Sequence, residues 1–151
     1  DKRHLFTLAG EDKVYTSGKE KLIVNYKGFK ICPLICYDLR FPVFARNVEE
    51  YDVLLYVANW PEVRNYPWKQ LLIARAIENQ SYVIGVNRIG EDGNQINHSG
   101  DTMVLNPRGE KISETLAHQE LMETITLSEK YLSDFRKIFP VMLDSDDFKI
   151  I

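Results

Sequence analysis

Cys36 is the residue of this sequence whose position best suits covalent chemistry. It directly follows the apolar segment 29–35 (FKICPLI), and the more polar segment 37–42 (YDLRFP) comes after it. Open α/β sheets place reactive groups where strands end. A helix that begins there would favour the thiolate, and the backbone N–H of Tyr37 could donate to an oxyanion beside the sulfur. The alternative is that Cys36 belongs to the core, as cysteines in apolar segments commonly do.

Two charged segments near the N-terminus could support such a thiol. Lys2 lies in the run Lys2, Arg3 and His4, and a lysine near a thiol lowers its pKa and can stabilise an oxyanion. A carboxylate at Glu11 or at Asp12 could orient that lysine or move a proton. Taken alone, exposed surface charge is the simpler interpretation of these residues, because their spacing does not decide between the two readings.

The remaining cysteine and the histidines are weaker candidates. Cys32 lies four positions before Cys36 in apolar sequence, which indicates a core residue. A Cys–His hydrolase would need His98 or His118 beside Cys36, and we expect both histidines in loops. The three histidines show no HxH or HExxH spacing, and no glycine-rich nucleotide-binding motif occurs. We therefore expect neither a metal nor any other cofactor.

Short apolar segments alternate with amphipathic ones along the chain. The pattern predicts strands over 21–26, 29–35, 53–57, 81–87, 102–105 and 121–127, with turns at 27–28 and 106–109. It predicts helices over 42–50, over 68–80 and from the Ser128 cap to Pro140. Strands that alternate with helices indicate an α/β fold, and hairpins make its sheet mixed. No repeat or linker divides residues 1–151, so we expect one domain.

Composition limits the partners. The chain has 22 acidic and 19 basic residues spread along its length, so no basic face indicates nucleic acid or an anionic membrane as a partner. No apolar run approaches the roughly 20 residues that a membrane-spanning helix needs. Two cysteines without a disulfide framework suit a reducing compartment. These features predict a cytoplasmic protein that binds neither nucleic acid nor membrane.

Motifs through almost the whole chain resemble the nitrilase superfamily of carbon-nitrogen hydrolases. They lie at 2–6 (KRHLF), 35–42 (ICYDLRFP), 57–61 (VANWP), 74–79 (ARAIEN), 100–102 (GDT) and 106–109 (NPRG). Within the superfamily, the start at 1–6 (DKRHLF), the segment 58–61 (ANWP) and the C-terminal tail are most similar to bacterial omega-amidases. The resemblance implies an α-β-β-α sandwich of the carbon-nitrogen hydrolase type with mixed sheets, here lacking its N-terminal part.

The resemblance also implies a catalytic set of residues. Matched position by position, the family's lysine is Lys2, its cysteine is Cys36, and its supporting glutamate is Glu11, with Asp12 as the weaker match. The first glutamate of the family, a general base, has no match in this sequence, so the resemblance implies that the chain alone is inactive. Asn59 and Trp60, after the segment 53–57, would line the substrate pocket together with the N–H of Tyr37.

The implied reaction is hydrolysis of a small omega-amide such as 2-oxoglutaramate to an acid and ammonia through a cysteine thioester, in a homodimer or a higher homo-oligomer. One alternative keeps the fold and changes the substrate to a deaminated peptide, an N-carbamoyl compound or, less readily, a nitrile. Another is an inactive dimerising fragment. Asp38 with Arg40, and Arg75 with Glu78, are expected to form structural pairs, the second on or near an interface.

Overall fold

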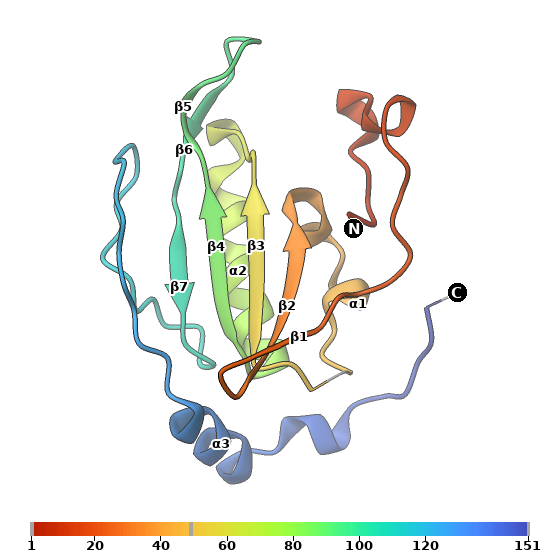
Figure 1. Ribbon diagram of the computed structural model, residues 1–151, viewed down its shortest axis with the longest axis vertical. Helices are drawn as coiled ribbons and strands as arrows, with labels where there is room; N and C mark the ends of the chain where they lie inside the picture. The colour runs from red at the N-terminus through yellow and green to blue at the C-terminus, as the bar shows by residue number, and fades with distance from the viewer. Residues whose placement is uncertain (1, 49, 151) are drawn as a thin grey trace.

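A five-stranded mixed sheet in the order β1-β2-β3-β4-β7 forms the centre of the computed structural model, which describes residues 2–48 and 50–150 (Figure 1). Its strands are β1 (Val24–Tyr26), β2 (Phe29–Ile35), β3 (Val53–Ala58), β4 (Tyr82–Asn87) and β7 (Met103–Leu105). The central strands β2, β3 and β4 are parallel, whereas β1 and β7 pair antiparallel at the two edges. The carboxyl ends of the three parallel strands therefore meet at one end of the sheet.

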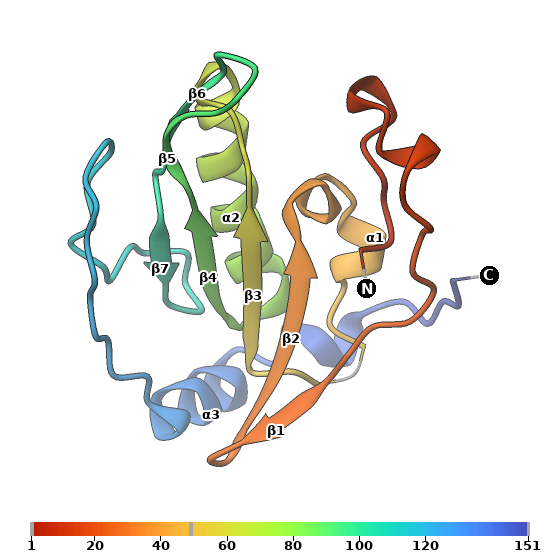
Figure 2. The same cartoon turned by 45° about the horizontal axis from the view of Figure 1, so that its top comes forward.

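The helical elements and a second hairpin surround this sheet. They are the α-helices α1 (Pro42–Ala45), α2 (Asn65–Asn79) and α3 (Glu129–Ile138), the 3-10 turns η1 (Thr7–Ala9), η2 (Glu11–Lys13), η3 (Cys36–Arg40), η4 (Glu62–Arg64) and η5 (Val141–Asp144), and the hairpin of β5 (Ile89–Glu91) and β6 (Asn97–Ser99). Figures 1 and 2 show α2 along one face of the sheet, α3 near the amino ends of β3 and β4, and the hairpin beyond their carboxyl ends.

The core lies between the sheet and α2. Trp68, Leu72 and Ala76 recur at helical spacing and are fully buried. They face the side of the sheet that carries the buried side chains Cys32, Leu34, Leu54, Tyr56 and Val83. The opposite side of the sheet is less covered. Ile35, Val57 and Val86 are 37%, 49% and 44% exposed there, although all three are apolar.

Two predicted elements are wrong. The helix expected over 42–50 ends at Ala45, and Glu49 lies outside the described residues. Asn47 ends the helix, because its backbone N–H donates to Asn79 Oδ1 at 3.0 Å. Its side chain also forms hydrogen bonds with the backbone of Tyr51. The segment 121–127 has no strand partner within the described residues. Its apolar pattern suggested a strand, but Met122 is 94% exposed.

The other predicted elements are confirmed, with ends that differ by up to three residues. The helix expected over 68–80 begins earlier, at Asn65, and the strand expected over 21–26 is reduced to Val24–Tyr26. Ser128 caps α3, and its hydroxyl accepts from the N–H of Tyr131 at 3.1 Å. Within residues 2–48 and 50–150, the structure has no helix of the length and apolar character needed to cross a membrane.

Gly85 allows the close approach of β4 and α2, and this contact generates a stability prediction. A Cβ at this position would lie 3.0 Å from Trp68 Cζ2 and closer still to Leu72 Cδ1. Gly85→Ala should lower the free energy of unfolding by about 1–3 kcal/mol, because both neighbours are buried. Gly93→Ala, where a Cβ would meet no atom within 4 Å, is the control. Urea denaturation of both variants would show equal stabilities if this packing were unimportant.

Candidate active site

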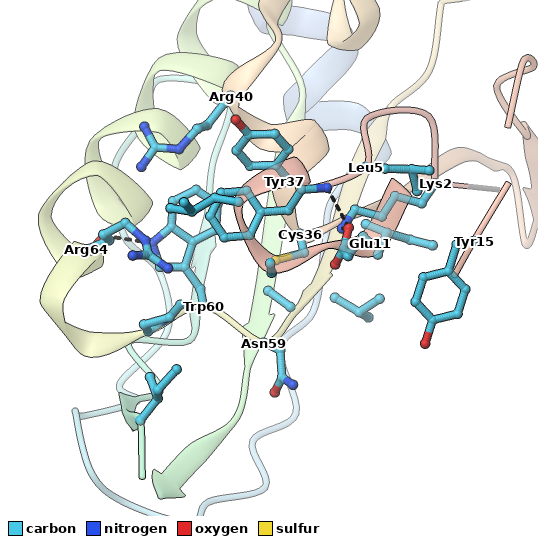
Figure 3. Close-up of a pocket in the computed structure, with 18 of the residues that line it drawn as sticks. Lys2, Leu5, Glu11, Tyr15, Cys36, Tyr37, Arg40, Asn59, Trp60 and Arg64 are labelled. Carbon is cyan, nitrogen blue, oxygen red and sulfur yellow. Dashed lines mark hydrogen bonds and ion pairs between the residues drawn. The ribbon is translucent and has the colours of Figure 1, made fainter. Parts of the chain in front are cut away.

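An open cleft of about 1030 Å³ lies where β2 and β3 end. It brings together all six site residues expected from the sequence, namely Lys2, Glu11, Cys36, Tyr37, Asn59 and Trp60. Figure 3 shows Cys36 between two groups, with Lys2 and Glu11 on one side and Trp60 on the other. Residues more than fifty positions apart in the chain therefore surround one thiol.

Cys36 occupies a sharp turn between a strand and a 3-10 helix. Its φ of 46° is in the left-handed region, which costs a non-glycine residue roughly 1–2 kcal/mol. β2 ends at Ile35, and the turn η3 begins with Cys36 itself. Strained backbone of this kind persists where the surrounding structure holds it, and such positions cluster at active sites. The predicted junction of strand and helix is confirmed, with a short 3-10 turn in place of an α-helix.

The register of the parallel strands supplies a donor to the thiol. Ile35 pairs with Val57, so the residues that follow each strand lie close together at the sheet edge. The backbone N–H of Asn59 donates to the Cys36 sulfur, and the N–H of Tyr37 also interacts with it. The Tyr37 donor was expected from the sequence, whereas the Asn59 N–H depends on strand order. Together they form a small group of donors around the sulfur.

The thiol of Cys36 is nevertheless more basic than a free cysteine. Burial raises its pKa, and the lowering effects of the Asn59 N–H, the Lys2 charge and the Tyr37 N–H do not fully offset burial. Glu11 acts in the same direction as burial. The Tyr37 N–H at the start of the turn η3 acts to favour the thiolate, as expected, but burial outweighs it. A single 3-10 turn aligns few peptide dipoles, so it contributes little against desolvation.

Lys2 and Glu11 form an ion pair beside the thiol. Lys2 Nζ donates a hydrogen bond to Glu11 Oε2, and the backbone N–H of Phe6 donates to the same oxygen at 2.7 Å. Burial acts to raise the pKa of Glu11, but the bonds from Lys2 and Phe6 outweigh it and the pKa is lowered. Asp12, the alternative to Glu11, is exposed and makes no part of the cleft wall. The structure therefore selects Glu11 as the partner of Lys2.

A buried carboxylate connects the N-terminal segment to the turn at Cys36. Asp38 is fully buried, and its Oδ1 lies 2.9 Å from both the backbone N and Nδ1 of His4. Its Oδ2 accepts from the N–H of Ile35 at 3.2 Å. Because a carboxylate only accepts, the imidazole contact assigns a proton to Nδ1. The predicted pairing of Asp38 with Arg40 is wrong, since the Arg40 guanidinium lies over the Trp60 ring, 5.0 Å from its centroid.

Asn87 is a supporting residue that the sequence reasoning missed. Trp60 N–H donates to Asn87 Oδ1 at 2.8 Å, and Asn87 Nδ2 donates to Trp60 O at 3.0 Å. Trp60 Nε1 in turn donates to the carbonyl of Arg64 at 2.7 Å. Asn87 is the polar last residue of β4, next to β3 in the sheet, and this position was the available signal.

The pair of Arg75 and Glu78 is confirmed, with an Nη1 to Oε1 distance of 2.9 Å. Arg75 is only 3% exposed, and its Nη2 donates to Leu39 O at 2.7 Å, so it connects α2 to the turn η3. Through Arg75, this pair supports the turn η3, which begins with Cys36, from the side of α2. Whether it also lies near an interface between copies stays a prediction.

The histidines take no part in the contacts of Cys36. His98 Nδ1 lies 3.3 Å from Gly90 O, and the ring borders the cleft. His118 Nε2 lies 3.2 Å from Glu62 Oε1 and is largely exposed. Over residues 2–48 and 50–150, no group of three or more His, Cys, Asp or Glu side chains has metal-binding geometry.

The fold and cleft define an α/β protein with a cysteine at the edge of a mixed sheet and a Lys–Glu pair beside it. The sequence profile described as carbon-nitrogen hydrolase matches residues 1–135. The chain belongs to the carbon-nitrogen hydrolase family.

Individual relatives agree with this placement. The chain is 50% identical over 150 residues to "Omega-amidase YafV" of Escherichia coli K12, a match that covers 99% of this chain and 59% of that protein. It is 35% identical to "2-oxoglutaramate amidase" of Bacillus subtilis, covering 95% of this chain and 55% of that protein. The solved structure of XC1258 from Xanthomonas campestris, a CN-hydrolase superfamily protein with an arsenic adduct in its active site, matches with a TM-score of 0.97 and 48% identity, covering 100% of this chain and 60% of that one. The chain thus spans over half the length of these relatives.

Asp38→Asn should separate the N-terminal segment from the nucleophile turn. The amide keeps the shape but turns one acceptor into a donor, facing N–H groups that are already donors. We expect the free energy of unfolding to fall by about 1.5–3 kcal/mol, the range for hydrogen bonds to a charged group. Asp12→Asn, an exposed carboxylate in the same region, should change stability by less than about 0.5 kcal/mol. Equal urea midpoints for the two variants would contradict this role of Asp38.

Lys2→Met should make Cys36 still harder to ionise. The Lys2 charge acts to lower the pKa of Cys36, so its loss raises that pKa and leaves Glu11 uncompensated. At about pH 8, alkylation by iodoacetamide should slow about 3- to 10-fold, and full reactivity should require a higher pH. Lys13→Met, at an exposed lysine, is the matched control. Cys36→Ser reports labelling of the buried Cys32. An unchanged pH profile in Lys2→Met would show that the two groups are not coupled.

Proposed function

We propose that this chain carries the cysteine, lysine and supporting glutamate of an amidohydrolase that releases ammonia from a small omega-amide such as 2-oxoglutaramate. The observation that carries the proposal is the position of the Cys36 sulfur between the Lys2–Glu11 pair and the Asn59 and Tyr37 N–H groups. Relatives named omega-amidase and 2-oxoglutaramate amidase support this choice of substrate class.

In the first step, Sγ of Cys36 adds to the amide carbonyl carbon and a C–S bond forms. The carbonyl electron pair moves to oxygen, where Lys2 Nζ and the N–H groups of Tyr37 and Asn59 are available to stabilise the negative charge. When this intermediate collapses, the C–N bond breaks and the nitrogen leaves as ammonia, because it has received the proton that the Cys36 thiol lost on attack. A thioester on Cys36 remains.

In the second step, water adds to the thioester carbonyl, the C–S bond breaks, and the carboxylic acid and the free thiol form. The resemblance assigns the proton transfers to a glutamate that has no match in residues 1–151. Glu11 has a different role in this proposal. Its Oε2 is occupied by Lys2 and by the Phe6 N–H, and its pKa is lowered, so it is suited to orienting Lys2 as an anion.

We further propose that residues 1–151 are the C-terminal portion of one carbon-nitrogen hydrolase domain that acts as a homodimer. The partly exposed apolar face with Ile35, Val57 and Val86 supports packing of this sheet against a second sheet, as in an α-β-β-α sandwich. A reducing compartment such as the cytoplasm would keep Cys36 as the free thiol that the reaction needs.

Ammonia release from 2-oxoglutaramate by the complete gene product tests the proposed function. Cys36→Ala should lower kcat at least about 1000-fold, because it removes the nucleophile. Cys32→Ala removes the buried thiol four positions earlier and should retain most activity. Lys2→Met should lower kcat about 100-fold or more, as expected for loss of an oxyanion donor.

The outcomes separate the alternatives. No release from 2-oxoglutaramate by the unmodified protein, with Cys36 still open to alkylation, would move the proposal to another amide or an N-carbamoyl compound. No release together with an unreactive Cys36 would favour a non-catalytic, assembling protein.

A further inference from the structure

Two arginine side chains border the cleft without a carboxylate partner in residues 2–48 and 50–150. Two other arginines pair with acids, Arg75 with Glu78 and Arg136 with Asp52, whereas the half-buried Arg46 donates to the backbone carbonyl of Glu78. Arg64 has no such pair, and its guanidinium lies 5.6 Å from the centroid of the Phe6 ring. Arg40 lies over the Trp60 ring. Planar guanidinium groups held on aromatic faces keep their edges available for a carboxylate.

The backbone of Arg64 is held by hydrogen bonds to its neighbours. Its carbonyl accepts from Trp60 Nε1 at 2.7 Å, and its backbone N–H donates to Pro61 O at 3.0 Å. Trp60 is itself held by Asn87, so the turn η4 is connected to the ends of both β3 and β4. The side chain is half-buried against Phe6. A side chain on a fixed backbone that packs against an aromatic ring has fewer conformations to lose when a ligand binds.

Charged side chains lie on both sides of Cys36, and one further carboxylate, Asp92, lines the cleft. Figure 3 shows Arg64 and Trp60 on one side of Cys36, and Lys2 with Glu11 on the other. Lys2 is paired with Glu11 and, in the proposed reaction, serves the oxyanion beside Cys36, so it does not serve a second anionic group of the ligand. The charge of Arg64 is not compensated by a side chain of the described residues. A small molecule that spans the thiol would therefore favour an anionic group at its Arg64 end.

We propose that Arg64 binds the free carboxylate of the substrate, through both edge N–H groups, while the amide at the other end of the molecule faces Cys36. This inference rests on the proposed amidohydrolase function and defines its specificity. The preferred substrates are short amides that end in a carboxylate, and neutral amides of the same length are discriminated against. Arg40, packed on Trp60, supports the indole and is not the carboxylate site.

The test is steady-state kinetics of the complete gene product with 2-oxoglutaramate and with pentanamide, a neutral amide of the same chain length. Arg64→Gln should raise KM for 2-oxoglutaramate about 10- to 100-fold, the range for a lost hydrogen bond to a charged group, and change kcat much less. The kcat/KM for pentanamide should change less than about threefold. Arg64→Lys keeps the charge but not the two-pronged geometry. Its KM for 2-oxoglutaramate should therefore lie between that of the unmodified protein and that of Arg64→Gln.

Arg108→Gln is the matched control. Its guanidinium also lies on an aromatic ring, 4.7 Å from the centroid of Phe135, but it does not border the cleft. This variant should retain the preference for the carboxylate-bearing amide. Equal losses on both substrates in Arg64→Gln would overturn the proposal and show a structural role. Loss of the preference in Arg40→Gln, with Arg64→Gln unaffected, would also overturn it.

A binding measurement tests this inference independently of the proposed function. In a Cys36→Ala background, calorimetric titration with 2-oxoglutaramate should show affinity about 10- to 100-fold lower when Arg64→Gln is added. If the unmodified protein hydrolyses neither amide but binding still depends on Arg64, the proposed function fails and the carboxylate site stands. Binding that is equal with and without Arg64 would overturn the site, whatever the activity.

Discussion

The buried carboxylate of Asp38 is the interaction on which the candidate site depends. It accepts from the backbone and the imidazole of His4 and from the N–H of Ile35. Ile35 is the last residue before Cys36, and His4 is two residues after Lys2. One anion without solvent contact thus connects the segment that carries Lys2 to the turn that carries Cys36. A buried charge of this kind is stable only while its hydrogen bonds are complete, which makes the arrangement intolerant of partial loss.

The edge of the parallel strands collects the other parts of the site. β2 ends at the nucleophile turn, β3 ends before Asn59 and Trp60, and β4 ends at Asn87. The helix α2 also supports this edge, because its Arg75 donates to the carbonyl of Leu39 in the turn η3. The site residues that follow β2, β3 and β4 are therefore within a few residues of regular structure. Positions of this kind are more rigid than those on long loops, and rigidity is what a binding or catalytic cleft needs.

The pKa of the Cys36 thiol reflects a balance between burial and the hydrogen-bond donors and positive charge around the sulfur. Burial raises the pKa of the thiol, whereas the Asn59 and Tyr37 N–H groups and Lys2 act to lower it. The same donors are suited to a negative charge on an oxygen that forms beside the sulfur, so they serve the resting thiol and a tetrahedral intermediate alike. A thiol that stays protonated until a ligand and a base are present is also protected from oxidation, because the thiolate is the reactive form.

Local sequence by itself determined the alternation of strands and helices, the Ser128 cap and the place of Cys36 at the end of a strand. Periodicity and capping depend on neighbours within a few positions, so a linear pattern contains them. Motif resemblance added Lys2 and Glu11. Tertiary structure alone decided the rest. It set the end of α1 at Ala45, through the bond from Asn47 to Asn79, and left the segment 121–127 without a strand partner in residues 2–48 and 50–150. It also decided the choice of Glu11 over Asp12 and the raised pKa of Cys36. The physical reason is common to all of them. Burial, strand order and hydrogen bonds between residues 9 to 34 positions apart are set by the packed chain, and no local pattern records them.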